Sequence, residues 1–195
     1  KAIAIALAKE GCAVGLMARS EEALSETAKA CREFGSPVFA LPIDLGSPLA
    51  AAEGLKLLTR ELGGLDILVN NAGTGGSGSI EELELEDYDR VLNLNLRSVI
   101  ALCKQAIPNL KKSDNPAIIN IASVAGILTY PGGTAYATSK HAVRGFTACL
   151  FDDVREYGIK VSAISPGYVN TDMVQSPKLD SSKMIQTQDI VDALM

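Results

Sequence analysis

Short, continuously apolar stretches alternate with segments of helical periodicity along almost the whole chain. The β-rich runs lie at 12–18, 37–44, 66–70, 117–122 and 159–165. The helical patterns lie at 1–10, 21–34, 48–62, 85–112, 134–157 and 188–195. Strands that are apolar on both faces are typical of parallel sheets covered by helices on each side. The alternation therefore predicts a doubly wound α/β fold, built from βαβ units around one open parallel sheet.

The length and the spacing of the segments predict a single domain. The chain has 195 residues, with no repeat and no low-complexity linker, so one domain is expected over residues 1–195. Four glycines, at 11, 35, 63 and 158, follow helical segments, where a residue with left-handed backbone commonly ends the helix.

Charge and cysteine usage narrow the classes of partner. A formal net charge of −5 argues against nucleic acid or an anionic membrane surface. No apolar run reaches the roughly 18 residues that a membrane-spanning helix needs. The cysteines, Cys12, Cys31, Cys103 and Cys149, have scattered spacings that are typical of reduced thiols, so no metal site is expected. These features favour a cytoplasmic protein, with an upstream targeting segment left open.

Small or polar residues follow three of the predicted strands. In doubly wound sheets, ligands bind beyond the carboxyl ends of the strands. We therefore expect a binding site at this edge of the sheet. The residues concerned are Asn70, Asn71, Gly73, Ser123, Pro166 and Gly167.

A tyrosine and a lysine stand four residues apart on the predicted helix at 134–157. Tyr136 and Lys140 project from the same helix face, and a cation beside a phenol favours the phenolate. Such a pair suits proton transfer at a carbonyl or alcohol oxygen. The spacing alone can arise by chance, and Ser123 alone can be an ordinary turn or capping serine.

Taken together, these residues resemble the short-chain dehydrogenase/reductase family, over nearly the whole chain. The family signatures occur in order: "NNAG" at 70–73, Asn95, Ser123, Tyr136, Lys140, Pro166 with Gly167, and Thr171. The resemblance implies an oxidoreductase that exchanges a hydride between a nicotinamide cofactor and a carbonyl or alcohol carbon.

The resemblance also assigns a role to each catalytic residue. Tyr136 is expected to be the general acid in reduction and the base in oxidation, and Ser123 to hydrogen-bond the reacting oxygen. Lys140 is expected to favour the ionised form of Tyr136 and to bind the nicotinamide ribose. Asn95 is expected to anchor a water molecule in a proton relay.

The expected cofactor preference depends on the residues that end the strand at 12–18, which corresponds to the second strand of the family. Relatives that prefer NAD place a carboxylate there, whereas this chain has Ala18 and Arg19, and Arg19 can pair with a 2′-phosphate. NADP(H) is therefore favoured over NAD(H). By resemblance, Asp44 and Leu45 contact the adenine, and Val169 and Thr171 hold the carboxamide. The expected cofactor-binding residues are Arg19, Ser20, Asp44, Leu45, Asn71, Ala72, Gly73, Tyr136, Lys140, Pro166, Gly167, Val169 and Thr171.

The family's first strand and glycine-rich turn are not found in the sequence. "KAIAIALAKEG" resembles the helix that follows this turn, and "TQDIVDALM" resembles the first turns of a helix. Truncation at both ends is therefore expected. In the family's strand order, the missing strand lies between the strands at 12–18 and 66–70.

Substrate and assembly are less constrained. Residues 172–187 are expected to form a lid, and a small or medium carbonyl compound such as a 3-oxoacyl thioester fits, as do sugars and steroids. By resemblance, the helices at 85–112 and 134–157 form a homodimer or homotetramer interface through Val143, Phe146, Leu150 and Phe151. A non-catalytic relative that binds a nucleotide or a protein partner is the alternative.

Overall fold

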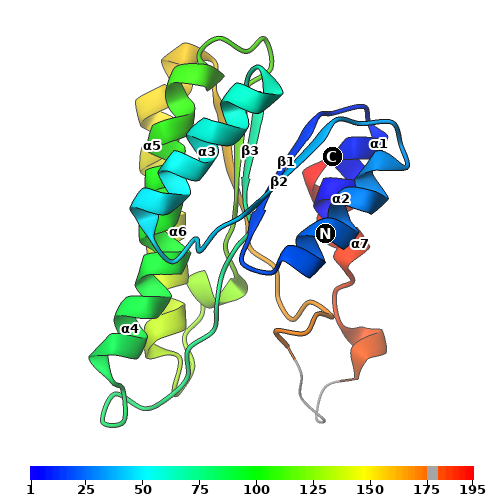
Figure 1. Cartoon of the computed structure of the whole chain (residues 1–195). Helices are drawn as coiled ribbons and strands as arrows, with labels where there is room; N and C mark the ends of the chain where they lie inside the picture. The colour runs from blue at the N-terminus through cyan, green and yellow to red at the C-terminus, as the bar shows by residue number, and fades with distance from the viewer. Residues whose placement is uncertain (175–179) are drawn as a thin grey trace.

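Parallel strands lie between two layers of helices (Figure 1). The computed structural model describes residues 1–174 and 180–195. The strands are β1 (Val14–Ala18), β2 (Val38–Pro42), β3 (Ile67–Asn70), β4 (Ala117–Ile121) and β5 (Lys160–Ile164). The helices are α1 (Ala2–Lys9), α2 (Glu21–Arg32), α3 (Pro48–Leu62), α4 (Leu85–Leu92), α5 (Ser98–Leu110), α6 (Thr134–Val154) and α7 (Thr187–Leu194).

All five predicted strands are present, each within a few residues of its expected bounds, which confirms the α/β prediction. The helix predicted at 85–112 is divided, because a π-helical turn at Asn93–Arg97 separates α4 from α5. The helix predicted at 134–157 ends in a 3₁₀ turn at Arg155–Tyr157. The four glycines predicted to end helical segments all have positive φ, between 72° and 85°.

The strands form two parallel ladders. β1 pairs with β2, and β3, β4 and β5 pair in that order. In the described part of the chain β1 and β3 do not pair, and both line a cavity of about 1200 Å³. This is the position at which the family's strand order places the first strand, between the strands at 12–18 and 66–70, so the gap between the two ladders agrees with the expected doubly wound fold.

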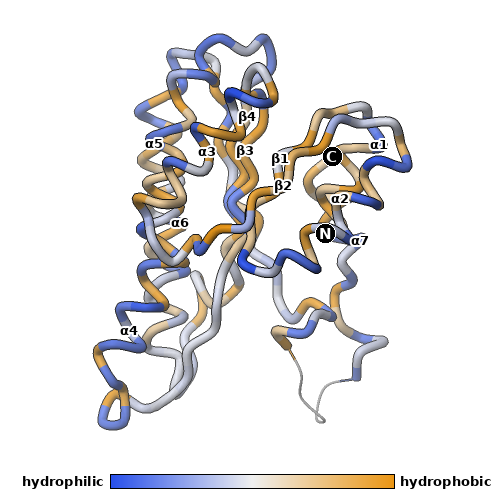
Figure 2. The backbone as a smooth tube through the Cα atoms, in the orientation of Figure 1, coloured by the Kyte–Doolittle hydropathy of each residue, from blue (hydrophilic) through white to orange (hydrophobic). Residues whose placement is uncertain are grey.

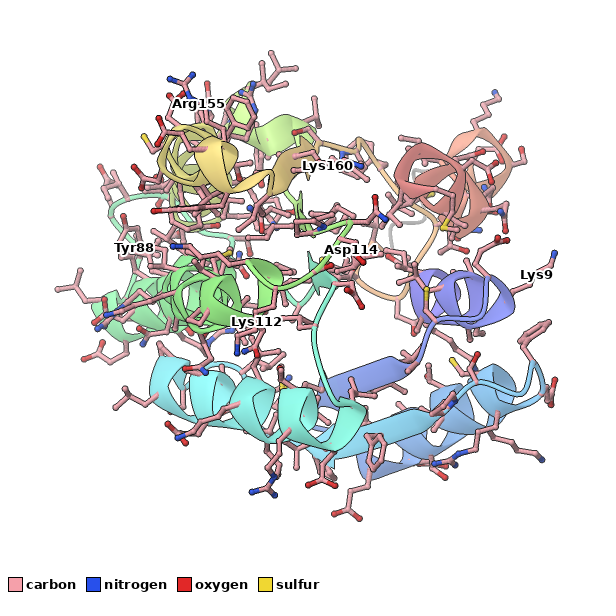
Figure 3. All side chains as sticks on the ribbon, turned by 90° about the horizontal axis from the view of Figure 1, so that it is seen from above. Lys9, Tyr88, Lys112, Asp114, Arg155 and Lys160 are labelled. Carbon is pink, nitrogen blue, oxygen red and sulfur yellow. The ribbon has the colours of Figure 1, made fainter. Side chains whose placement is uncertain are left out.

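The larger core lies between the three-stranded ladder and the layer of α3, α5 and α6. Figure 2 shows apolar residues concentrated along the strands, and Figure 3 shows α5 and α6 side by side with α3 packed next to α5. Leu102, Leu110 and Ile118 are among the buried residues of this core. On the other side of the strands, α1 contacts both α2 and α7.

One expectation about the helix surface needs correction. Leu150 belongs to the core and Val143 is 1 % exposed, so neither is available for contact with a second subunit. Phe146 packs against the core, whereas Phe151 is 45 % exposed. Helical periodicity had placed all four near one another without showing which face the core covers. Separately, none of the described helices is long and apolar enough to cross a membrane.

Candidate active site

The cavity beside β3 continues to the carboxyl ends of the three-stranded ladder. Most of the sequence-predicted site residues line it, and they come from five segments of the chain. They are Leu45, Asn71, Ala72, Gly73, Ser123, Tyr136, Lys140, Pro166, Gly167, Val169 and Thr171.

Ser123 lies two residues after β4, at the start of the 3₁₀ turn Val124–Gly126. Its side-chain oxygen accepts a hydrogen bond from the Ala125 N–H at 3.1 Å and caps the turn. A hydroxyl that accepts in this way keeps its own hydrogen for another acceptor. Ser123 is 9 % exposed and lines the cavity, so this hydrogen is available to an oxygen atom bound there.

Tyr136 and Lys140 are presented by the first two turns of α6. The Lys140 Nζ donates to the Ile121 carbonyl at 2.9 Å and lies 5.7 Å from the centroid of the Tyr136 ring. Burial lowers the pKa of Lys140 to about 8, because an apolar environment disfavours its charged form. The lysine can therefore gain and lose a proton near neutral pH.

Asn95 is held in the π-helical turn and is 1 % exposed. Its side-chain oxygen accepts from the Thr74 N–H at 2.8 Å, and its amide nitrogen donates to the Thr74 carbonyl at 2.9 Å and the Ser139 hydroxyl at 3.0 Å. Both amide hydrogens are thus used within the protein. The expected water relay would have to use the remaining lone pair of the side-chain oxygen or the main-chain carbonyl.

The 3₁₀ turn that Ser123 caps, here named the serine turn, is packed against α6. Arg144 donates to the Gly126 carbonyl at 2.9 Å. A Cβ added to Gly126 would lie 2.6 Å from the Lys140 carbonyl oxygen, closer than side-chain atoms approach a backbone. The absence of a side chain at Gly126 therefore sets how near Ser123 lies to α6.

Four of the predicted site residues do not line the cavity: Arg19, Ser20, Asp44 and Asn95. Arg19 is exposed just after β1, and Ser20 caps α2 by accepting from the Ala23 N–H. Asp44 is exposed and accepts from the Gly46 N–H at 2.9 Å. Leu45, which does line the cavity, also belongs to the core.

Sequence reasoning missed several residues that support the site. Asn95 is hydrogen-bonded by Ser139 and Thr74, and the Gly126 carbonyl by Arg144, all across long sequence separations. Of these residues, only Ser139 has a signal in the sequence, which is its position beside Lys140. Tyr130 was also missed. Burial raises its pKa, with further contributions from nearby Tyr136 and Tyr168, so the three phenols lie near one another.

Within the described residues, no group of three or more histidine, cysteine, aspartate or glutamate side chains is arranged to hold a metal ion. The four cysteines are free thiols.

Comparisons with known proteins identify relatives of this chain. The family model described as short chain dehydrogenase matches residues 1–181. A D-beta-hydroxybutyrate dehydrogenase of Rhizobium meliloti is 34 % identical over 198 residues, covering 100 % of this chain and 77 % of its own length.

Solved structures show the same fold. A short chain dehydrogenase of Burkholderia cenocepacia in complex with NADP has a TM-score of 0.91 and 31 % identity, covering 99 % of this chain and 82 % of its own. An NAD⁺-bound xylitol dehydrogenase has a TM-score of 0.82 and 33 % identity, covering 87 % of this chain, which spans 66 % of that enzyme. The chain belongs to the short-chain dehydrogenase family of oxidoreductases.

Proposed function

We propose that the protein is an NADP(H)-dependent oxidoreductase that interconverts a carbonyl compound and the corresponding alcohol. The observation that carries this proposal is the meeting of Ser123, Tyr136 and Lys140 in one cavity. A phenol, a hydroxyl with a free hydrogen and a buried amine are the groups that proton transfer at a carbonyl oxygen requires. The intact set also argues against the alternative of a non-catalytic relative.

The residues present fit a nicotinamide cofactor along the strand ends. A Cβ added to Gly73 would lie 3.3 Å from the Asn95 Oδ1 and 3.6 Å from the Lys140 Nζ, so the backbone passes close to both groups and a side chain at this position would press on Asn95. Asn71, Ala72 and Gly73 line the cavity on one side, and Gly167 lines it on another. The buried Lys140 ammonium is suited to ribose hydroxyls.

When bound, the nicotinamide supplies or accepts the hydride. In reduction, the Tyr136 hydroxyl gives its proton to the carbonyl oxygen while the Ser123 hydroxyl donates a hydrogen bond to the same atom. Charged Lys140 stabilises the phenolate that remains. In oxidation, the Tyr136 phenolate removes the proton from the alcohol.

Preference for NADP(H) rests on Arg19. The guanidinium follows β1 and is exposed, and no carboxylate pairs with it among the residues that the structure describes. A free guanidinium suits the bidentate binding of a 2′-phosphate. Relatives use both cofactors, since the Burkholderia cenocepacia structure holds NADP and the xylitol dehydrogenase holds NAD⁺.

The proposed substrates are small or medium carbonyl compounds, with 3-oxoacyl compounds first. The relative from Rhizobium meliloti is named for D-beta-hydroxybutyrate, a 3-hydroxy acid, and a second relative is named for xylitol, a sugar alcohol. Part of the lid expected at 172–187 falls on residues 175–179, which lie outside the described residues. We further propose that the protein acts in the cytoplasm as a homodimer or homotetramer.

The decisive assay follows NADPH oxidation by the full-length protein at 340 nm. Acetoacetate, a 3-oxoacyl thioester, a ketose and a steroid ketone cover the proposed classes. We expect turnover of at least one, with a higher kcat/KM for NADPH than for NADH. Turnover of none, in a protein that binds NADPH, would favour the non-catalytic alternative.

A further inference from the structure

Ser139 lies between the two catalytic residues of α6 and is fully buried, with 0 % exposure. Its hydroxyl donates to the Tyr136 carbonyl at 2.7 Å and accepts from the Asn95 amide at 3.0 Å. The hydroxyl has one hydrogen, and the helix carbonyl takes it. The oxygen can therefore act toward Asn95 only as an acceptor.

The direction of this hydrogen bond, from Asn95 to Ser139, fixes the orientation of the Asn95 side chain. Because Ser139 presents a lone pair, the nitrogen of the amide must face α6, and its second hydrogen reaches the Thr74 carbonyl at 2.9 Å. The oxygen then accepts from the Thr74 N–H at 2.8 Å. Reversal of the amide would place its oxygen against the Thr74 carbonyl and the Ser139 lone pair, and its nitrogen against the Thr74 N–H, inside a buried cluster.

We propose that Ser139 is a positioning residue, which acts through Asn95 to hold the wall formed by Gly73 and Thr74 against the catalytic helix. The Asn95 Oδ1 and the Lys140 Nζ both lie within 4 Å of the point that a Gly73 Cβ would occupy. A shift of Asn95 would therefore move the wall relative to Lys140. The inference rests on the proposed function, because this wall lies on the side proposed for the nicotinamide.

The same helix offers a matched control. Thr147 is 6 % exposed, donates to the Val143 carbonyl at 2.7 Å and accepts from the Asn120 amide at 2.9 Å. It thus repeats the arrangement of Ser139, about 12 Å further along the helix axis. Its hydrogen bonds lead through Asn120 to the Asn70 side chain at the end of β3, and not to Asn95 or the Gly73 wall.

The test compares Ser139→Ala with Thr147→Val, each of which removes one buried hydroxyl. Both variants should lower Tm by a similar amount, because each leaves an amide donor unpaired. Only Ser139→Ala should weaken NADPH binding and lower kcat/KM, each by about tenfold or more, since small displacements of catalytic groups are costly. Ser139→Thr, which restores the hydroxyl, should recover most of both losses.

A double-mutant cycle tests whether Ser139 acts through Asn95. In an Asn95→Ala background, Ser139→Ala should cost little further kcat/KM, because the group it positions is gone. Equal losses in both backgrounds would contradict the positioning role, as would equal kinetic effects of Ser139→Ala and Thr147→Val. If the wild type bound no NADPH, the proposed function would be contradicted. If the wild type bound NADPH and Ser139→Ala bound it with the same affinity, only this inference would be contradicted.

Discussion

Replacement of Gly126 by alanine would place a methyl group against the backbone of the catalytic helix. The added carbon would lie 2.6 Å from the Lys140 carbonyl oxygen and 2.9 Å from the Arg144 side chain. Carbon and carbonyl oxygen approach to about 3.3 Å at closest in folded proteins. The serine turn must therefore retreat from α6 by roughly 0.7 Å, because the helix backbone cannot yield as a side chain does.

This retreat should cost both stability and activity. Overpacking of this kind destabilises by about 1–3 kcal/mol, which lowers Tm by roughly 2–12 °C in a chain of this size. Ser123 moves with the turn, so kcat should fall by about 10- to 100-fold. Differential scanning fluorimetry and steady-state kinetics of Gly126→Ala measure the two effects.

Gly145 provides the matched control for the same substitution. It lies inside α6, and a Cβ added there meets nothing within 4 Å. Gly145→Ala should raise Tm slightly, because alanine favours the helix by about 0.5–1 kcal/mol over glycine, and kcat should not change. If Gly126→Ala matched Gly145→Ala in both Tm and kcat, the argument that close packing positions Ser123 would be refuted.

Three further predictions concern charge and assembly. Arg19→Asp should reverse cofactor preference, lowering kcat/KM for NADPH far more than for NADH, and an unchanged ratio would show that Arg19 does not bind the 2′-phosphate. Since burial lowers the pKa of Lys140 to about 8, the folded protein binds fewer protons than the unfolded chain between pH 8 and 10.5. Lys140 should therefore contribute stability that grows with pH across this window, so the free energy of unfolding of the wild type minus that of Lys140→Met, from urea titrations at each pH, should rise from pH 8 to 10.5. Phe151→Glu should shift light-scattering mass from dimer or tetramer toward monomer, since Phe151 is 45 % exposed on α6, whereas a monomeric wild type would contradict the assembly proposal.

Local rules made the order of strands and helices readable from the sequence. The apolar runs are parallel strands, and glycines such as Gly63 and Gly158 do adopt the left-handed conformation that ends a helix. The edge of the strands at which Ser123 lies also follows from these rules, because parallel strands bring their carboxyl ends to one side, whereas Tyr136 and Lys140 on α6 were expected there from the family resemblance. These features depend on a few neighbouring residues at a time.

Features that depend on distant contacts were not readable. The π-helical turn at Asn93–Arg97 is a single turn inside a helical segment, and such turns are rare, so the helical periodicity over 85–112 did not predict it. The hydrogen-bond partners of Asn95 lie 21 and 44 residues away, at Thr74 and Ser139, and no local sequence pattern predicts these bonds. The burial of Val143 depends on which face of α6 the core covers, which is a property of packing rather than of spacing.

The most direct test of the central claim is Tyr136→Phe in the full-length protein. The substitution removes one hydroxyl that lines the cavity and leaves the ring beside Lys140. NADPH affinity and Tm should stay near the wild-type values, while kcat with the best carbonyl substrate should fall by at least about 100-fold. Wild-type kcat in this variant would contradict the assignment of Tyr136 as the proton donor, and with it the proposed chemistry of the site.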